Sequence, residues 1–571
     1  MNGPEITGNV ELSYGAYNLN IKIQNSLRFI SGLILIFSLC QPAYAFNNSQ
    51  DLNNNTLDYA GVQDLIALLI SDSFAKRNRA MHDILEISKD PGVLTALENE
   101  LESADAIGRI TITFTLFLAG DDPDVRFHEL MDIFSNGSIE EQTEISHLLS
   151  VWLDPALHSE YIDAIVHLWS FELDPYVKVC LLSVLGSYVV NSEVLDLVIS
   201  AAYDPSIEVK FRAAMSLGST QGEYSVLAQN PKIIDTLIYL LNDPDPGVRG
   251  MACSSLGSHG YSDEVYYALL NVYGTESSVN TRSTALLQIA RIGPKEVTAP
   301  MVLNALQSQN RQFRVLATAA VSYIGNYPGF VQSISDILEE GIPRWGIFIY
   351  AGPYYQLQLL GSDACDAIPT LISIIEQRRD DADNAIETLK YISTCQDDVI
   401  PTLKDVLINE SNYYLIKEAI LAAGEIGTSD GILIPELIGI AGTDSFEYYT
   451  SEWPLSYYAV DSLGEFGDFE IELEPELKAL LEDSPDEAFA VHLHLALFKL
   501  NSDPEIHKQK IFDALFSDDE LVVDNALWAC GELGPLAYEM LPKIQELVEI
   551  YMNTHVLFGW QGVLQKITAE H

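Results

Sequence analysis

The side chains with the most regular spacing in this sequence are basic. Asp-Pro turns are followed by a valine and a basic residue, as in the stretches 204–210 and 243–249. A base at one fixed position of a repeat can pair with a carboxylate of the neighbouring turn, and such charge-assisted pairs are strong. We therefore predict a structural ladder of ion pairs, with a row of anion contacts as the alternative. The predicted ladder residues are Lys178, Lys210, Arg249, Arg282 and Arg314.

Aromatic side chains gather in two irregular stretches, near residues 342–356 and 442–467, and in the second they alternate with carboxylates. Exposed Tyr and Trp beside acidic groups suit a basic or polar protein partner. The alternative is that the rings repair packing where a repeat is distorted. We favour that alternative for 342–356 and leave both open for the second stretch. The candidate partner-binding residues are Trp345, Tyr350, Tyr354, Phe446, Tyr448, Tyr449, Trp453 and Tyr457.

No catalytic, cofactor-binding or metal-binding constellation is predicted. His128-Glu129 is a single His-Glu pair, and His492 and His494 are two residues apart, so on a helix they face different directions. The acidic run 468–476 lacks the spacing of an EF-hand. The sequence also lacks a Gly-rich phosphate loop after a strand, a GxSxG motif and a CxxC motif. We therefore expect no enzyme, no cofactor and no small-molecule ligand.

The elements that position these residues form a repeating unit. After each basic residue comes a small residue, then a Leu-Gly pair that ends the first helix, as at Ala213 and Leu217-Gly218. We expect this glycine to adopt the left-handed conformation. A second, apolar helix follows, and in many copies a proline opens it: Pro231, Pro300, Pro369, Pro401, Pro435, Pro475 and Pro542. The pattern predicts an all-α fold, a right-handed α-solenoid superhelix of about thirteen helix-turn-helix repeats.

These recurring residues resemble the HEAT-repeat family, and among its branches the bacterial HEAT-like repeats first noted in phycobilin lyases. The resemblance covers most of residues 57–568. It implies a scaffold that binds protein through its concave face and through loops on one edge. A lyase-like enzyme with a tetrapyrrole pocket, or a chaperone, is the alternative that the branch implies, and such lyases work inside cells.

The charge of the chain is strongly negative. It has 82 Asp and Glu residues against 30 Lys and Arg residues, a net charge of −52. Nucleic acids and anionic membranes attract basic surfaces, so the balance argues against both. It favours a protein partner of basic character, and adaptation of the surface to salt is the alternative.

The N-terminal region predicts export. Lys22 and Arg28 precede the apolar run 29–40, and residues 43–45 read Ala-Tyr-Ala, which is typical of a secretory signal cleaved after Ala45. We expect an extension plus signal peptide over 1–45, a polar linker over 46–56 and the solenoid over 57–571. The mature protein would be secreted or periplasmic, with no membrane insertion.

The cysteines leave one question open. Cys180, Cys253 and Cys530 fall on apolar helix faces, where a thiol packs as a small hydrophobe. Cys365 and Cys395 occupy corresponding turns of consecutive repeats. They can form a disulfide in an oxidising compartment, or remain as two free thiols.

Overall fold

The computed structural model of the chain describes residues 59–71, 73–153, 159–171, 173–218, 227–342, 352–392, 399–426, 431–443, 453–484, 486–552 and 560–569. Residues 1–58 lie outside these ranges. The predicted signal peptide and linker therefore lie outside the described residues.

The described part of the chain folds into α-helices that pair in sequence order, with short 3-10 segments at several helix ends. The pairs are α2 (Tyr59–Leu69) with α3 (Phe74–Ile87), α4 (Pro91–Leu101) with α5 (Ala106–Leu118), α6 (Pro123–Asn136) with α7 (Ile139–Trp152), α8 (Ile162–Leu168) with α9 (Pro175–Leu185), α10 (Ser192–Ala201) with α11 (Ile207–Leu217), α12 (Pro231–Leu240) with α13 (Pro246–Ser258), α14 (Asp263–Thr275) with α15 (Val279–Ile292), α16 (Lys295–Leu306) with α17 (Arg311–Ala317) and its continuation α18 (Val321–Ile324), α19 (Phe330–Glu339) with α21 (Pro353–Leu360), α22 (Ile368–Glu376) with α23 (Ala382–Tyr391), α24 (Ile400–Asn409) with α25 (Tyr413–Ile426), α26 (Ile434–Ala441) with α27 (Leu455–Leu463), α28 (Glu470–Asp483) with α29 (Glu487–Lys499), α30 (Pro504–Ala514) with α31 (Glu520–Leu533), and α32 (Leu541–Met552) with α33 (Trp560–Thr568).

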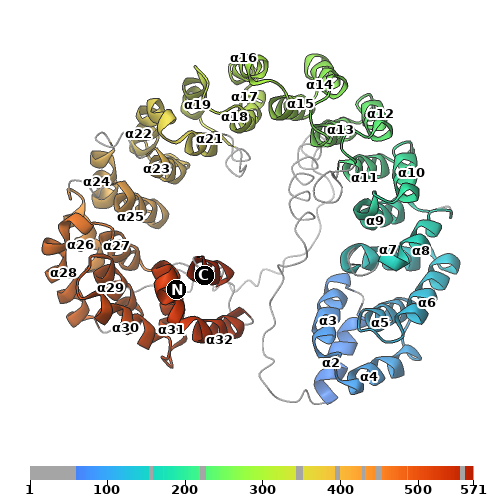
Figure 1. The fold of residues 1–571 in the computed structure, drawn as a ribbon, viewed down its shortest axis with the longest axis horizontal. Coiled ribbons are helices and arrows are strands. Elements are labelled where there is room, and N and C mark those ends of the chain that lie inside the picture. Colours follow the sequence, from blue (N-terminus) through green and yellow to red (C-terminus); the bar gives the residue numbers. More distant parts are fainter. Residues whose placement is uncertain are drawn as a thin grey trace, which may run out of the picture. The chain divides into compact units, whose positions relative to one another are not determined.

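The pairs stack into two layers (Figure 1). The helices that carry the ladder residues form one layer, in which α7, α9, α11, α13 and α15 pack successively on one another, as do α21, α23, α25, α27, α29 and α31. We call these the first helices, and their pair partners, such as α10, α12 and α14, the second helices. The predicted all-α solenoid of helix pairs is confirmed: each pair buries its apolar stripe against its neighbours.

The Asp-Pro turn lies inside a pair, whereas the repeat pattern predicts that it opens one. Asp204-Pro205 connects α10 to α11, and Asp243-Pro244 connects α12 to α13. The longer connection, from Gly218 to Asn230, joins one pair to the next. The short link forces the two helices of a pair to be antiparallel neighbours.

The glycine of the Leu-Gly pair has a different role from the one predicted. Gly186 and Gly218 have φ of −57° and −82°, so they are not left-handed. A Cβ at Gly186 would lie 2.5 Å from Ser216 Oγ, and one at Gly218 would lie 2.6 Å from Ser255 Oγ. Glycine is therefore needed here because adjacent first helices approach too closely for a side chain. Positive φ occurs instead at other helix ends, such as Gly325 at 83°.

Proline begins most of the predicted second helices but not all of them. Pro231 is the first residue of α12, whereas Pro300 and Pro475 lie inside α16 and α28. These two helices start about one turn earlier than the proline pattern predicts. Each of these two prolines is the sixth residue of its helix, beyond the first turn, so each removes one backbone hydrogen bond of the helix.

The N-terminal end is closed by an additional contact. α5 is buried along residues 110–117, because α3, α4, α6 and α7 surround it. Arg77 of α3 reaches Glu144 of α7 at 2.7 Å, and Phe74 stacks on His147 with centroids 3.9 Å apart. This arrangement covers the apolar face that a terminal repeat would otherwise expose. Among the described helices, none is long and apolar enough to cross a bilayer.

Candidate functional site

Ion pairs join four of the first helices, α9, α11, α13 and α17, to the tight turn of the following pair. Lys178 Nζ of α9 lies 2.6 Å from Asp204 Oδ2, and Lys210 of α11 pairs with Asp243. Arg314 of α17 pairs with Glu340, which follows α19. The basic side chains are between 14% and 23% exposed, so solvent screens these pairs only partly.

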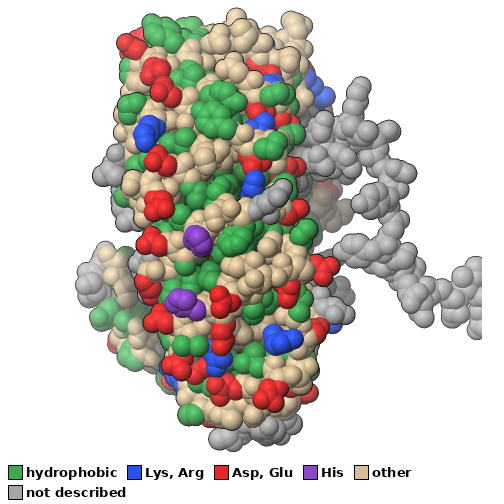
Figure 2. All heavy atoms as spheres, turned by 90° about the vertical axis from the view of Figure 1, so that its right-hand side faces the viewer, with side chains coloured by type: hydrophobic (Ala, Val, Ile, Leu, Met, Phe, Trp, Pro, Cys, Tyr) green, Lys and Arg blue, Asp and Glu red, His purple; other side chains and the backbone are tan. Residues whose placement is uncertain are grey.

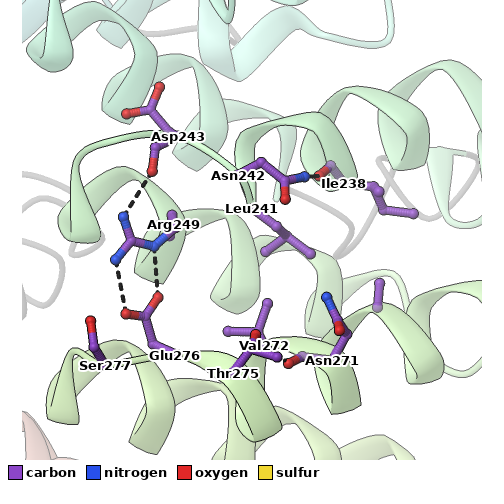
Figure 3. A pocket seen from close by; sticks show the side chains of 11 residues that line it. Ile238, Leu241, Asn242, Asp243, Arg249, Asn271, Val272, Thr275, Glu276 and Ser277 are labelled. Atoms are coloured by element: carbon purple, nitrogen blue, oxygen red, sulfur yellow. Dashed lines mark hydrogen bonds and ion pairs between the residues drawn. The ribbon is translucent and has the colours of Figure 1, made fainter.

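Arg249 makes the most complete of these contacts (Figure 3). Its Nε and Nη2 donate to the two carboxylate oxygens of Glu276 at 2.6 and 2.8 Å, and Nη1 donates to the carbonyl oxygen of Asp243 at 2.8 Å. The hydrogen bonds from Arg249 lower the pKa of the Glu276 carboxyl. A bidentate pair with this geometry fixes the distance between neighbouring units.

Arg282 differs from the other four ladder residues. Its guanidinium carbon lies 5.0 Å from the centroid of the Tyr273 ring and 4.7 Å from that of Phe313, and Nε donates to the carbonyl oxygen of Tyr273 at 3.1 Å. The group is thus held between two aromatic faces, where cation–π attraction stabilises it.

Two of the predicted partner-binding tyrosines belong to the same system. Tyr354 of α21 donates its hydroxyl to Asp381 Oδ2 at 2.8 Å, and Tyr457 of α27 donates to Asp486 Oδ2 at 2.9 Å. Each aspartate lies in the tight turn of the next pair, where the ladder carboxylates lie elsewhere. Burial raises the pKa of Tyr354, so its hydroxyl keeps the proton that it donates.

The described members of the aromatic candidate set are buried. Tyr354 is 6% exposed, Trp453 8% and Tyr457 0%, so these rings are not available as surface contacts. Their burial fits the packing interpretation, which we favour for 342–356 and leave open beside partner binding for the second stretch. Trp345, Tyr350, Phe446, Tyr448 and Tyr449 lie outside the described residues.

Trp453 is the centre of an aromatic cluster that spans three consecutive units. It precedes α27, and its ring centroid lies 4.8 Å from that of His492 in α29 and 5.0 Å from that of Trp528 in α31. The Tyr413 hydroxyl of α25 donates to the Trp453 carbonyl oxygen. This cluster anchors the chain directly after residues 444–452. These residues belong to the second irregular stretch and lie outside the described ranges, and we call them the insert.

His492 is fully buried in the same cluster and has a structural role. Its Nδ1 lies 2.8 Å from Asp461 Oδ1, and its Nε2 lies 2.7 Å from Asn525 Oδ1. The Asn525 amide is oriented by its own hydrogen bond to the Leu521 carbonyl oxygen at 2.7 Å. Both ring nitrogens are therefore engaged, which leaves no lone pair for a metal ion.

His494 faces a different direction from His492, as the spacing predicts. Its Nδ1 lies 2.9 Å from Nδ1 of His507 in α30, so one ring must donate to the other. Burial lowers the pKa of His494 to about 4. Within the described residues, no cluster of three or more His, Cys, Asp or Glu side chains could hold a metal ion.

A pocket lies between α12 and α14, beside the Arg249 pair (Figure 3). It has a volume of about 380 Å³ and is lined by Ile238, Leu241, Asn242, Asp243, Arg249, Ala268, Asn271, Val272, Thr275, Glu276 and Ser277. Its charged groups are already paired: Arg249 with Glu276, and Asp243 with Lys210 of α11. It offers polar contacts but no nucleophile with an adjacent base.

Cys365 is disulfide-bonded. Its predicted partner, Cys395, lies outside the described residues. Cys180, Cys253 and Cys530 are buried free thiols, as their positions on apolar helix faces predict.

Comparison with known proteins supports the same architecture of repeated helix pairs. A family model described as HEAT repeats matches residues 195–278. No curated protein matches the chain. The described chain is an α-solenoid of HEAT-like helix pairs, of which residues 195–278 match the family model. Membership of the whole chain in the HEAT-repeat family, and in its phycobilin-lyase branch, stays a prediction.

Solved structures of karyopherins share the architecture. A structure of Kap95p with RanGDP is similar over 96% of this chain and 79% of its own, with 14% sequence identity and a TM-score of 0.53. Kap121p bound to Ste12p covers 91% and 71% at 13% identity and a TM-score of 0.42, and the Kap95:Nup1 complex covers 86% and 84% at 13% and 0.42. At this level of identity, the first similarity establishes the fold alone.

Proposed function

We propose that this protein is an exported, non-enzymatic scaffold that holds a basic protein partner on the concave face of its solenoid and on the insert 444–452. The observation that carries the proposal is the anchoring of the insert: Trp453 is fixed by contacts to Tyr413, His492 and Trp528. Binding residues commonly lie on segments that a rigid scaffold positions.

Exposed groups beside this anchor suit an interface. Tyr414, the neighbour of Tyr413 on α25, is 58% exposed, and Lys417 Nζ lies 5.3 Å from the centroid of the Tyr458 ring. Tyrosine is enriched in protein interfaces because it offers a large, rigid contact area. The insert itself adds Asp444, Glu447 and Glu452 among aromatic residues. Rings and carboxylates together favour a partner rich in Lys and Arg.

The surface charge supports the same kind of partner. Figure 2 shows acidic side chains spread over one face, with fewer basic ones among them. A net charge of −52 steers basic proteins towards the chain over a Debye length of about 8 Å at physiological salt. A solved structure of similar fold is that of Kap95p with another protein, RanGDP.

Export is proposed on the signal sequence together with Cys365. A disulfide at this residue fits an oxidising compartment, such as the extracellular space or the periplasm. Fractionation of source cells and N-terminal sequencing test the location. We expect a mature chain that begins at Phe46, and an intact cytosolic chain would contradict export.

The binding proposal is tested by replacing 444–452 with a Gly-Ser linker of the same length. Trp453 is kept, because its loss would disturb three units. The control replaces 219–226, between α11 and α12, in the same way. Immobilised chains are incubated with the native extracellular fraction, and bound proteins are quantified by mass spectrometry. We expect a basic partner to be lost at least tenfold with the first variant only, whereas equal recovery by all three chains would remove the insert from the proposal.

A further inference from the structure

In the ladder, a carboxylate lies six residues before each base, and one unit lacks this carboxylate. Asp204, Asp243 and Glu276 each lie six residues before the next ladder base, at 210, 249 and 282. Each of these carboxylates accepts a hydrogen bond from the backbone N–H two residues later, at 2.9, 2.9 and 2.7 Å. Each also pairs with the ladder base of the preceding unit.

Ser308 occupies this position in the turn between α16 and α17, six residues before Arg314. Its Oγ accepts the equivalent hydrogen bond from the Asn310 N–H at 3.2 Å, so this turn makes the same side-chain-to-backbone contact as the others. A serine supplies no carboxylate, however, and the preceding base, Arg282, is left without its ladder partner.

Arg282 is held in place without that partner. The rings of Tyr273 and Phe313 flank its guanidinium at 5.0 and 4.7 Å, and Nε is bonded to the Tyr273 carbonyl oxygen. Within the described part of the chain, Nη1 and Nη2 of Arg282 have no hydrogen-bond acceptor. A guanidinium fixed in this way loses little conformational entropy when it binds, because the fork is already oriented.

We propose that Arg282 forms the open rung of the ladder and binds an oxyanion, either a carboxylate of a protein partner or a phosphate group. The filled rung at Arg249 shows how a guanidinium holds one carboxylate with two parallel N–H···O bonds (Figure 3). At Arg282 these bonds would come from Nη1 and Nη2, because Nε already donates to the Tyr273 carbonyl oxygen.

A second base lies beside the vacant position. Arg314 Nη1 donates to the carbonyl oxygen of Ser308 at 2.7 Å, as Arg249 Nη1 does to Asp243. Arg314 would therefore lie close to an anion bound at the Ser308 turn, as Arg249 lies close to the turn at Asp243. This site is separate from the insert, and it selects the opposite charge to the proposed basic partner.

The test uses the mature chain and two probes. The probes are inorganic phosphate, measured by calorimetry, and a fluorescein-labelled peptide of Asp and Glu residues, measured by anisotropy at low salt. The variants are Arg282→Gln, which removes the guanidinium, and Ser308→Asp, which supplies the missing carboxylate within the chain. Arg291→Gln is the matched control, because it removes the same charge from an exposed position on the same helix.

We expect the wild-type chain to bind one of the two probes, and which one it binds identifies the source of the oxyanion. Arg282→Gln and Ser308→Asp should weaken binding at least tenfold, and Arg291→Gln should change it less than twofold. Ser308→Asp should also raise the melting temperature, and it keeps the test valid if Arg282→Gln fails to fold. Binding of neither probe, equal weakening by Arg291→Gln, or unchanged binding by Ser308→Asp would overturn the proposal.

Discussion

A methyl group added at position 218 would test how the first helices pack. Gly218 ends α11, and a Cβ there would lie 2.6 Å from Oγ, 2.9 Å from Cβ and 3.1 Å from Cα of Ser255 on α13. The hydroxyl can rotate away, but the Cβ and Cα atoms move only with the helix. The two helices must therefore separate by about 0.5 Å to restore an ordinary carbon–carbon contact.

The expected effect of Gly218→Ala is the difference between two terms. Overpacking costs about 1–3 kcal/mol, and alanine in place of a helical glycine gains about 0.5–1 kcal/mol. We expect the free energy of unfolding to fall by about 1–2 kcal/mol. Gly439 in α26 is the control, because nothing lies within 4 Å of a Cβ built there. Gly439→Ala should leave stability unchanged or raise it by about 0.5 kcal/mol.

Urea unfolding followed by circular dichroism measures both variants, with linear extrapolation to water. A double-mutant cycle with Ser255→Gly isolates the contact, because that change removes Oγ and Cβ from the interface. The loss caused by Gly218→Ala should be smaller in the Ser255→Gly background. Equal stability of Gly218→Ala and wild type, or equal losses at 218 and 439, would refute close packing as the reason for the glycine.

Further predictions concern single side chains. Glu276→Gln should lower the free energy of unfolding at pH 7 by about 1–3 kcal/mol, because it leaves the partly buried Arg249 without a carboxylate; the deficit relative to wild type should shrink in acid, where protonation of Glu276 removes the same pair. His494, flanked by His507 and Lys510, is neutral in the folded state down to about pH 4, whereas the unfolded chain protonates it near pH 6.5. Stability should therefore fall between pH 7.5 and pH 5, and His494→Gln should remove at most about 2 kcal/mol of this fall in urea titrations. Denatured mature protein should react with Ellman's reagent at three thiols before reduction, since Cys40 is removed and Cys365 is bridged, and five reactive thiols would contradict a bridge within the chain. Trp453→Ala should lower the melting temperature, whereas Tyr414→Ala, at an exposed ring, should not.

The periodic features of the chain could be predicted from the sequence. Helix pairs, the all-α class and the Lys and Arg positions follow from spacing alone, because each unit repeats the same contacts with its neighbours. The role of Gly218 could not be predicted, since a glycine that ends a helix and one that permits close approach look alike in sequence. The distinction requires the position of Ser255, which lies 37 residues later (255 − 218) on the next first helix, α13.

The sequence did not predict the ladder contacts made by tyrosine or the unpaired position of Arg282, for a related reason. Tyr354 and Tyr457 replace a charged residue by a neutral donor, so a search for bases at the ladder position passes over them. Their aromatic neighbours in the sequence fit either a packing role or an exposed surface, because burial depends on helices that are distant in sequence. The signal at Ser308 was present as a serine at a position that otherwise carries a carboxylate, and it could have been found by aligning the turns on their bases.

The central claim is that this solenoid exists to hold another protein. The most direct measurement is the mass of the native particle, isolated under mild conditions from the compartment in which the chain accumulates and analysed by light scattering and mass spectrometry. The account predicts a particle heavier than the 63.2 kDa chain that contains a basic protein and dissociates at high salt. A particle that contains only this chain at every salt concentration would contradict it.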